Sequence, residues 1–194
     1  MADGVIILAA GSSRRLGRPK QLLDLEGKPL LQHVIDAAEA ADVDDIVLVL
    51  GHMADDIAAA VTLPQNARVV VNPDHATGQA SSLRMGLQAL GGGIDRAVVV
   101  LGDQPRIRPE AIRAVAASAR PIARALYTGA PSHPVAFDRS TWEALSSVDG
   151  DLGARVLLSA RAADVCAVEL GGAPPQDVDT EAEYLRIRGA LGAG

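Results

Sequence analysis

The chain has 194 residues, of which 48% are hydrophobic and 22% charged, so it has enough apolar side chains for the core of one globular domain. The formal net charge of -6 argues against binding to nucleic acid or to an anionic membrane, and an aromatic content of 2% is too low for a platform that stacks single-stranded bases. The apolar runs are too short to span a membrane, and the first ten residues lack the basic segment of a signal peptide, so we expect a cytoplasmic location.

Short apolar runs alternate with helical patterns along the chain. The apolar runs predict strands at 5–10, 46–50, 69–71, 97–101 and 165–168. Apolar residues at helical spacing predict helices at 30–38, 57–61, 83–90, 109–115, 142–145, 152–159 and 181–191. The segment 124–137 carries Gly129, Pro131 and Pro134 and predicts an edge strand or a hairpin. The alternation indicates one α/β domain over 1–194, with a mostly parallel sheet and helices on both faces.

The single cysteine, Cys166, excludes an intramolecular disulfide and a thiolate zinc cluster. It lies in the last predicted strand, where we expect a buried and inert core thiol. A nucleophilic thiol is the alternative.

The turn after the first strand combines glycine, serine and basic residues. It reads LAAGSSRRLGRPK over 8–20 and places basic residues at positions 14, 15, 18 and 20. Ligands of open α/β sheets bind at the carboxyl ends of strands, and Gly11 leaves room for backbone amides to approach a phosphate. The turn lacks the lysine-serine order of a Walker loop and the second glycine of a dinucleotide-binding loop. Its composition favours a polyphosphate site over a solvated basic turn.

The motif Leu8-Ala9-Ala10-Gly11-x-Ser13-x-Arg15-x-Gly17-x-x-Lys20 resembles the signature loop of the MobA-like nucleotidyltransferases, and within them most closely that of the molybdenum cofactor cytidylyltransferases. The resemblance covers about 5–185. It implies a Rossmann-like three-layer α/β/α sandwich of the nucleotide-diphospho-sugar transferase type, with a nucleotide half near 1–105 and an acceptor half near 106–194. Ala10, where related guanylyltransferases usually have a glycine, favours cytosine. The resemblance implies a nucleoside triphosphate bound by Leu8, Ala9, Ala10, Gly11, Ser12, Ser13, Arg15 and Lys20.

Two acidic residues stand where a metal could bind. Asp103 follows the strongest predicted strand, and Asp179 precedes the last predicted helix. A turn or helix-cap role is the alternative for each. The resemblance implies instead that both bind Mg²⁺, that Asp177 is a bystander, and that Asp103 acts in catalysis with Arg15 and Lys20. Charge neutralisation and positioning would carry the reaction, because an attacking phosphate is already deprotonated and needs no general base.

Other segments match the same family. Gly78 and Ser82 are implied to line the nucleotide site, although a serine near a helix start is often a cap. His52 is expected near the base, and His75 is given no role. In the acceptor half, His133 lies in a stretch that resembles a family motif, and its place beside Pro134 suggests an ordered turn that faces the acceptor, with a structural histidine as the alternative. Asp151 and Arg155 lie in a second family motif. Their charge and hydrogen-bonding capacity predict contacts with the pterin, with a structural ion pair as the alternative.

The resemblance therefore implies an enzyme that uses CTP and Mg²⁺ to transfer CMP to the phosphate of molybdopterin carrying molybdenum and that releases pyrophosphate. A xanthine dehydrogenase-family molybdoenzyme or its chaperone is the implied protein partner, and neither nucleic acid nor a membrane is expected. Three alternatives stay open. The chain could use another base or acceptor, such as GTP or a sugar phosphate; it could be an NAD(P)H- or FMN-linked oxidoreductase; or it could be a non-catalytic nucleotide-binding partner of a chaperone.

Overall fold

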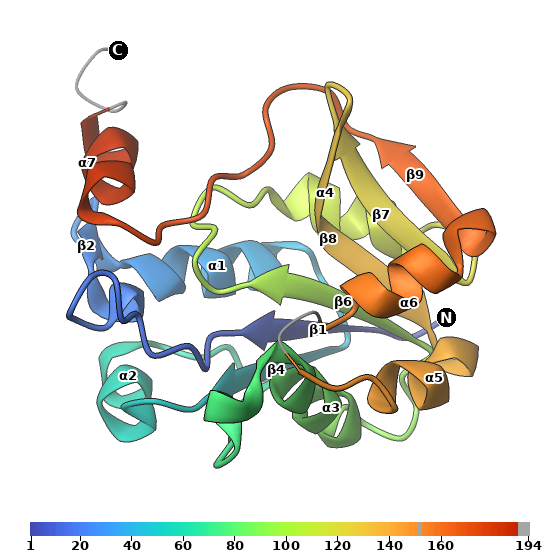
Figure 1. Ribbon diagram of the computed structural model, residues 1–194, viewed down its shortest axis with the longest axis horizontal. Helices are drawn as coiled ribbons and strands as arrows, with labels where there is room; N and C mark the ends of the chain where they lie inside the picture. Colours follow the sequence, from blue (N-terminus) through green and yellow to red (C-terminus); the bar gives the residue numbers. More distant parts are fainter. Residues whose placement is uncertain (151–152, 190–194) are drawn as a thin grey trace.

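The computed structural model describes residues 1–150 and 153–189. A seven-stranded sheet runs through it in the order β5-β4-β1-β6-β8-β7-β9 (Figure 1). Strands β1, β4, β5 and β6 are parallel, β8 is antiparallel to β6 and to β7, and β7 is parallel to β9. The strands are β1 (Asp3–Leu8), β4 (Asp45–Leu50), β5 (Ala67–Val71), β6 (Arg96–Leu101), β7 (Ile122–Tyr127), β8 (Ala130–Asp138) and β9 (Val165–Glu169).

Helices cover both faces of the sheet, as the alternating pattern predicts. One face packs against α1 (Leu30–Ala40), α2 (Ala54–Ala60) and α4 (Pro109–Ala116) through a continuous apolar core. The other face packs against α3 (Gln79–Ala89), α5 (Trp142–Ser146) and α6 (Arg155–Ala160) through a second core. Strands β1, β4 and β6 are buried on both faces, which explains why their sequences are uninterrupted apolar runs. The predicted three-layer α/β sandwich is confirmed.

The carboxyl ends of β1 and β6 face a small separate unit. Its hairpin of β2 (Asp24–Leu25) and β3 (Lys28–Pro29) follows the short helix η1 (Lys20–Leu22) and packs with α7 (Glu181–Gly189) around a third apolar cluster. Figure 1 shows α7 beyond the end of the sheet toward which β1 and β6 point. The remaining 3-10 turns are η2 (His75–Thr77), η3 (Arg139–Thr141) and η4 (Ala162–Asp164). In the described ranges, every helix is too short or too polar to cross a membrane.

The segment 124–137 forms the hairpin β7–β8, one of its two predicted forms, and this hairpin lies inside the sheet because β8 pairs with β6 and β9 pairs with β7. One sequence expectation needs correction. Cys166 is half-buried instead of lying in the core, because β9 is the edge strand and is covered on one side alone.

Smaller differences concern the ends of elements. The first strand ends at Leu8, which leaves the next two alanines in the loop. The predicted helix at 152–159 is seen from Arg155, and the helix at 181–191 is seen to Gly189. The residues 151–152 and 190–194 lie outside the described part of the chain.

Candidate nucleotide site

A cavity of about 680 Å³ opens at the carboxyl ends of β1 and β6. The loop after β1 forms one wall, the segment after β4 and η2 forms a second, and the start of α3 forms a third. Most of the residues predicted to bind the nucleotide line this cavity. They are Leu8, Ala9, Ala10, Gly11, Ser12, Lys20, Gly78 and Ser82, together with Asp103.

The loop after β1 is held from behind by a buried glutamine. Gln21 is 1% exposed, and its Nε2 donates to the carbonyl oxygens of Ala9 at 2.8 Å and Gly11 at 3.2 Å. Ser13 has a left-handed φ of 51°, and its Oγ accepts a hydrogen bond from the Lys20 amide at 3.1 Å. Ser13 therefore shapes the loop from within. A Cβ atom at Gly11 would meet nothing within 4 Å, so the space in front of this glycine is open to a phosphate.

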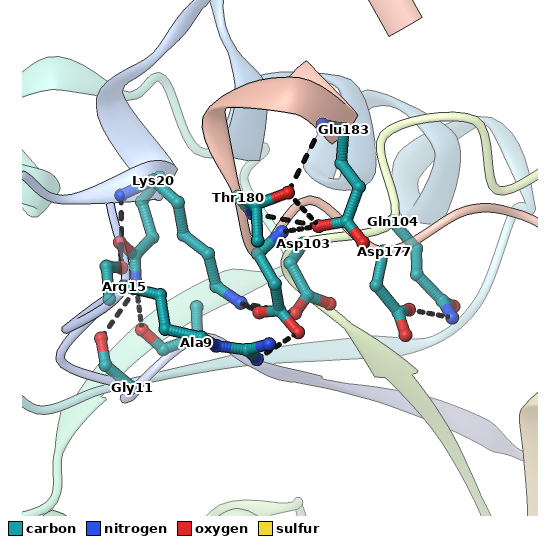
Figure 2. A network of polar contacts seen from close by, with 12 residues as sticks. Ala9, Gly11, Arg15, Lys20, Asp103, Gln104, Asp177, Thr180 and Glu183 are labelled. Carbon is teal, nitrogen blue, oxygen red and sulfur yellow. Dashed lines mark hydrogen bonds and ion pairs between the residues drawn. The ribbon is translucent and has the colours of Figure 1, made fainter. Parts of the chain in front are cut away.

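Two of the basic residues of the loop, Arg15 and Lys20, converge on the two predicted metal carboxylates (Figure 2). Lys20 Nζ lies 2.5 Å from Asp103 Oδ2 and 2.7 Å from Asp179 Oδ1. Arg15 Nη2 lies 2.6 Å from Asp179 Oδ2, and its side chain is 68% exposed. Four residues predicted for catalysis and metal binding are thus brought together, although they come from three distant parts of the chain.

The hydrogen bonds around Asp179 exclude the helix-cap alternative. The N-cap role belongs to Thr180, whose Oγ1 accepts from the Glu183 amide at 3.3 Å while Glu183 Oε2 accepts from the Thr180 amide at 2.8 Å. Glu183 Oε2 also accepts from the Asp179 amide at 3.0 Å. The cap holds the backbone of Asp179 and leaves its carboxylate to face Lys20 and Arg15.

Burial and charge set different pKa values for the two carboxyl groups. Burial raises the pKa of Asp103, and the attraction of Lys20 offsets this effect only in part. Burial alone would also raise the pKa of Asp179, but the contacts with Lys20 and Arg15 outweigh it and lower that pKa. Burial disfavours the charged form of Lys20, yet the two carboxylates outweigh it and raise the Lys20 pKa. Lys20 is therefore a fixed cation at neutral pH.

The carboxylates fit a divalent cation. Asp103 Oδ1 is buried and finds no hydrogen-bond partner among the described residues, so one oxygen of the buried carboxyl group is left for a ligand. Carboxylate oxygens are the ligands that Mg²⁺ prefers, usually one or two of them with water and substrate phosphates completing the shell. Within 1–150 and 153–189, no group of three or more His, Cys, Asp or Glu side chains comes together as a metal site.

Several residues of the site were missed or undervalued by the sequence analysis. Asp177 was expected to be a bystander, but its Oδ1 accepts a hydrogen bond from Gln104 Nε2 at 2.7 Å, and its charge helps to raise the pKa of Asp103. His75, which was given no role, lines the cavity with His52, and the two ring centroids are 6.2 Å apart. The sequence Gly102-Asp103-Gln104 does not indicate the hydrogen bond between Gln104 and Asp177. The sequence Gly51-His52 does not indicate that His75 lies beside His52.

Asn72 is a further residue that sequence reasoning passed over. It is 1% exposed, and its Nδ2 donates to Ser81 Oγ and Ser82 Oγ, each at 2.9 Å. The contact holds Ser82 next to the end of β5. Ser82 is not the helix cap, because the N-cap of α3 is Gly78 and Ser82 lies inside the helix. At the start of that helix, Gly78 has φ of 123°, a value that favours glycine.

Two of the three residues predicted to bind the acceptor, His133 and Arg155, are described by the structure. His133 is on β8, and Arg155 is the first residue of α6. Burial, together with the charges of Arg124 and Arg155, lowers the pKa of His133 to about 4. The third predicted residue, Asp151, lies outside the described residues.

The comparison with known families rests on the same segments. The family model described as the MobA-like NTP transferase domain matches residues 5–165, which includes the loop after β1 and Asp103. The chain belongs to the MobA-like NTP transferase family. This membership confirms the resemblance drawn from the motifs and places the chain among the nucleotidyltransferases.

Relatives of this MobA-like chain carry different names. Nicotine blue oxidoreductase of Paenarthrobacter nicotinovorans is 33% identical over 197 residues, covering 94% of each chain. The bifunctional protein GlmU of Streptomyces coelicolor is 39% identical over 119 residues, which is 59% of this chain and 24% of GlmU. The chain therefore matches about a quarter of the length of GlmU.

Solved structures confirm the fold over the whole chain. Rv0371c of Mycobacterium tuberculosis H37Rv superposes with a TM-score of 0.90 at 33% identity, covering 97% of this chain and 98% of Rv0371c. Its complex with manganese superposes with a TM-score of 0.84 at 30% identity, covering 98% of this chain and all of the other.

Proposed function

We propose that this chain is a CTP:molybdopterin cytidylyltransferase. An oxygen of the acceptor's terminal phosphate attacks the α-phosphorus of CTP, the bond from that phosphorus to the bridging oxygen of the β-phosphate breaks, and pyrophosphate leaves with the electron pair. The observation that carries the proposal is the convergence of Lys20, Asp103 and Asp179 at the mouth of a cavity lined by the open loop at Gly11.

The residues of the cavity divide the work of binding. The amides from Gly11 to Ser13 cradle the phosphates, and Arg15 and Lys20 neutralise the charge that develops on the leaving pyrophosphate. Asp103 and Asp179 would hold Mg²⁺, which neutralises phosphate oxygens when it is bound. The manganese complex of Rv0371c supports the use of a divalent cation. No side chain has to remove a proton, because the attacking phosphate is already ionised.

The nucleoside side of the cavity contains small polar groups. Gly78 and Ser82 line it with His52 and His75, and the Ser82 hydroxyl and the two imidazole groups can hydrogen-bond to the base. Ala10 follows Ala9 in the loop and supports cytosine. On the acceptor side, His133, Asp151 and Arg155 bind the pterin. The product would supply a xanthine dehydrogenase-family molybdoenzyme in the cytoplasm.

A direct assay tests the base and the acceptor together. CTP, GTP and ATP are each incubated with Mg²⁺ and molybdenum-loaded molybdopterin, and released pyrophosphate is measured. We expect release with CTP, and a loss of about 10²-fold or more in Lys20→Met. Lys28→Met is the matched control, because Lys28 forms an exposed surface pair with Asp36 at 2.7 Å. Activity with GTP but not with CTP would contradict the choice of base.

A second candidate function comes from the relative that matches this chain from end to end. Nicotine blue oxidoreductase is 33% identical and covers 94% of both chains, which favours a redox enzyme built on the same fold. The paired carboxylates at Lys20 argue for nucleotidyl transfer, since a redox dinucleotide has no need of a metal. Tight binding of NADPH or FMN in the presence of a chelator, with no pyrophosphate released from CTP, would establish the redox alternative.

A further inference from the structure

A second basic cluster lies beneath α6, and it consists of Arg124, His133 and Arg155. These residues come from β7, β8 and the first position of α6. Arg124 pairs with Val135 across the β7–β8 ladder, and the register shifts directly after it, between Arg124 and Ala125. The shift breaks the regular ladder beside His133. The cluster lies in the C-terminal half of the chain, whereas the loop after β1 lies in the N-terminal half.

Arg124 lacks part of the hydrogen bonding that its guanidinium requires. One of its nitrogens, Nη2, donates to the Pro131 carbonyl oxygen at 3.1 Å. Within 1–150 and 153–189, its buried Nε has no hydrogen-bond partner, and no carboxylate forms an ion pair with this side chain. A buried N–H group without an acceptor is costly, and the cost is greater in a cation. One donor of Arg124 is therefore without an acceptor among residues 1–150 and 153–189.

His133 is the neutral member of the cluster, and the positive charge comes from Arg124 and Arg155. Its carbonyl oxygen accepts from the Tyr127 hydroxyl at 3.2 Å, which fixes its backbone. Burial and the charges of Arg124 and Arg155 lower the pKa of its imidazole to about 4, so the ring is neutral at pH 7. Burial lowers the pKa of the Arg124 guanidinium, and the positive charge of Arg155 lowers it further. Two cations held near each other around a neutral ring are stabilised by an anion between them.

The cluster is connected to the nucleotide cavity through the start of α3. The Ala80 amide donates to the Gly150 carbonyl oxygen at 3.1 Å, and a Cβ atom at Gly153 would lie 3.0 Å from Gln79 Oε1. Gln79 lines the nucleotide cavity. Gly150 and Gly153 therefore pack against the start of α3, which forms part of the wall of that cavity.

We propose that Arg124 is an oxyanion-binding residue which, with His133 and Arg155, holds an anionic group of the acceptor. Its Nε and a second guanidinium nitrogen offer the paired donors that recognise phosphate-like oxygens. The ligand chemistry is that of an oxyanion, and it has two possible sources in the acceptor: a phosphate or an oxo-molybdenum group. The identity of the acceptor rests on the proposed function, whereas the oxyanion site itself is tested without turnover.

The test follows the four histidine rings by NMR as a function of pH. His133 reports on the basic cluster, His52 and His75 report on the nucleotide cavity, and His33 on α1, whose Nε2 lies 2.7 Å from the Leu25 carbonyl oxygen, is the internal control for folding. Inorganic phosphate and molybdate are added separately to the full chain. We expect at least one of them to raise the pKa of His133 by about one unit or more, because an anion favours the imidazolium form.

Two variants assign this shift to Arg124. In Arg124→Gln we expect the oxyanion to leave the pKa of His133 unchanged. Arg161→Gln removes the same charge from the exposed end of α6 and should keep the pKa shift. In the transfer assay, Arg124→Gln should raise KM for the acceptor about tenfold or more and leave KM for CTP unchanged. Arg124→Lys keeps the positive charge but lacks the paired donors, so we expect it to show part of the His133 pKa shift. It replaces Arg124→Gln in the test if the glutamine variant fails to fold.

The outcomes distinguish a phosphate from an oxo-molybdenum group as the ligand, and the oxyanion site from the proposed transfer activity. A shift with phosphate alone assigns the site to a phosphate group, and a shift with molybdate alone assigns it to the oxo-molybdenum end. A His133 pKa that neither oxyanion nor the acceptor moves overturns the inference, and so does a shift of equal size in Arg124→Gln. An intact shift in a protein without transfer activity would overturn the proposed function and leave the oxyanion site standing.

Discussion

Lys20 is the residue on which the charges of the site depend. Its side chain is 13% exposed, and that of Asp103 is 17% exposed, so the pair is largely shielded from water. We expect Lys20→Met to lower the free energy of unfolding by about 3 kcal/mol at pH 7, because two neighbouring carboxylates lose their shared cation. Denaturant unfolding in the presence of a chelator measures this change. The loss should shrink at acidic pH, where Asp103, with its raised pKa, becomes neutral.

The same substitution at Lys28 provides the comparison for Lys20. Lys28 and Asp36 form an exposed pair, for which screening by water leaves little net stabilisation. The unfolding midpoint of Lys28→Met should therefore stay near that of the unaltered protein. Equal losses in the two variants would show that the buried network contributes no more than an ordinary surface pair.

Asp103 is the residue that should control binding of a divalent cation. We expect Asp103→Asn to weaken Mn²⁺ binding in the presence of CTP by about tenfold or more, because a neutral amide is a poorer ligand for a hard cation than a carboxylate. Electron paramagnetic resonance of free Mn²⁺ measures the affinity directly. Asp36→Asn removes the same charge from the surface and should bind Mn²⁺ normally. Unchanged affinity in Asp103→Asn would remove Asp103 from the metal site.

Individual residue types were easier to predict than their contacts. The motifs pointed to Lys20, Asp103 and Asp179, and the structure brings these three together. What the motifs did not contain is that Lys20 joins both carboxylates, since these partners lie 83 and 159 residues away in the chain. Gln21 was passed over for a similar reason: a single glutamine in a loop carries no pattern, and its role appears only when its amide meets the carbonyl groups of the turn.

At the scale of elements, α3 is the helix that places part of the cavity wall. It packs closely on the sheet because Gly86 has no side chain: a Cβ atom there would lie 2.5 Å from Ile6 Cγ2 and 3.2 Å from Val49 Cγ2. We expect Gly86→Ala to cost about 1–3 kcal/mol of stability by pushing the helix from the sheet. Nucleotide affinity should fall as well, because the same helix carries Ser82 into the cavity.

Gly92→Ala is the control for this substitution. A Cβ atom at Gly92 would meet nothing within 4 Å, so the alanine should be neutral or slightly stabilising through the unfolded chain. Thermal unfolding and titration with CTP measure both effects. If Gly86→Ala binds CTP as well as Gly92→Ala does, then the position of α3 does not limit the affinity for the nucleotide.

The elements were predictable where a long apolar pattern exists. The runs that form β1, β4 and β6 are buried throughout, so hydrophobicity alone located them. The hairpin β2–β3 has two residues in each strand, which is too short for any periodicity. The prediction that Cys166 is buried was wrong because the apolar sequence of β9 does not reveal that β9 is the edge strand of the sheet in the described part of the chain.

For the whole molecule, the decisive feature is the return of the C-terminal segment to the first loop. The Val178 amide donates to the Asp103 carbonyl oxygen at 3.0 Å, and the Tyr184 hydroxyl donates to the Asp24 carbonyl oxygen at 2.6 Å. These contacts place α7 against the hairpin β2–β3 and bring Asp179 to the loop of Arg15. The fold class followed from the alternation of strands and helices, but this closure could not, because it depends on contacts between the two ends of the chain.

The stability of the whole molecule should depend on pH through His133. Its pKa is about 4 in the folded protein and near 6.5 in the unfolded chain, so between these values the unfolded chain binds more protons. The contribution of His133 is therefore fully present above pH 6.5 and is lost as the pH falls toward 4, a change of roughly 3 kcal/mol. Denaturant unfolding of His133→Gln, in a buffer free of phosphate, should show a flatter pH dependence over this window than the unaltered protein. Parallel curves for the two proteins would mean that the proton is bound equally in both states, and that the ring is not held neutral by burial and the arginines around it.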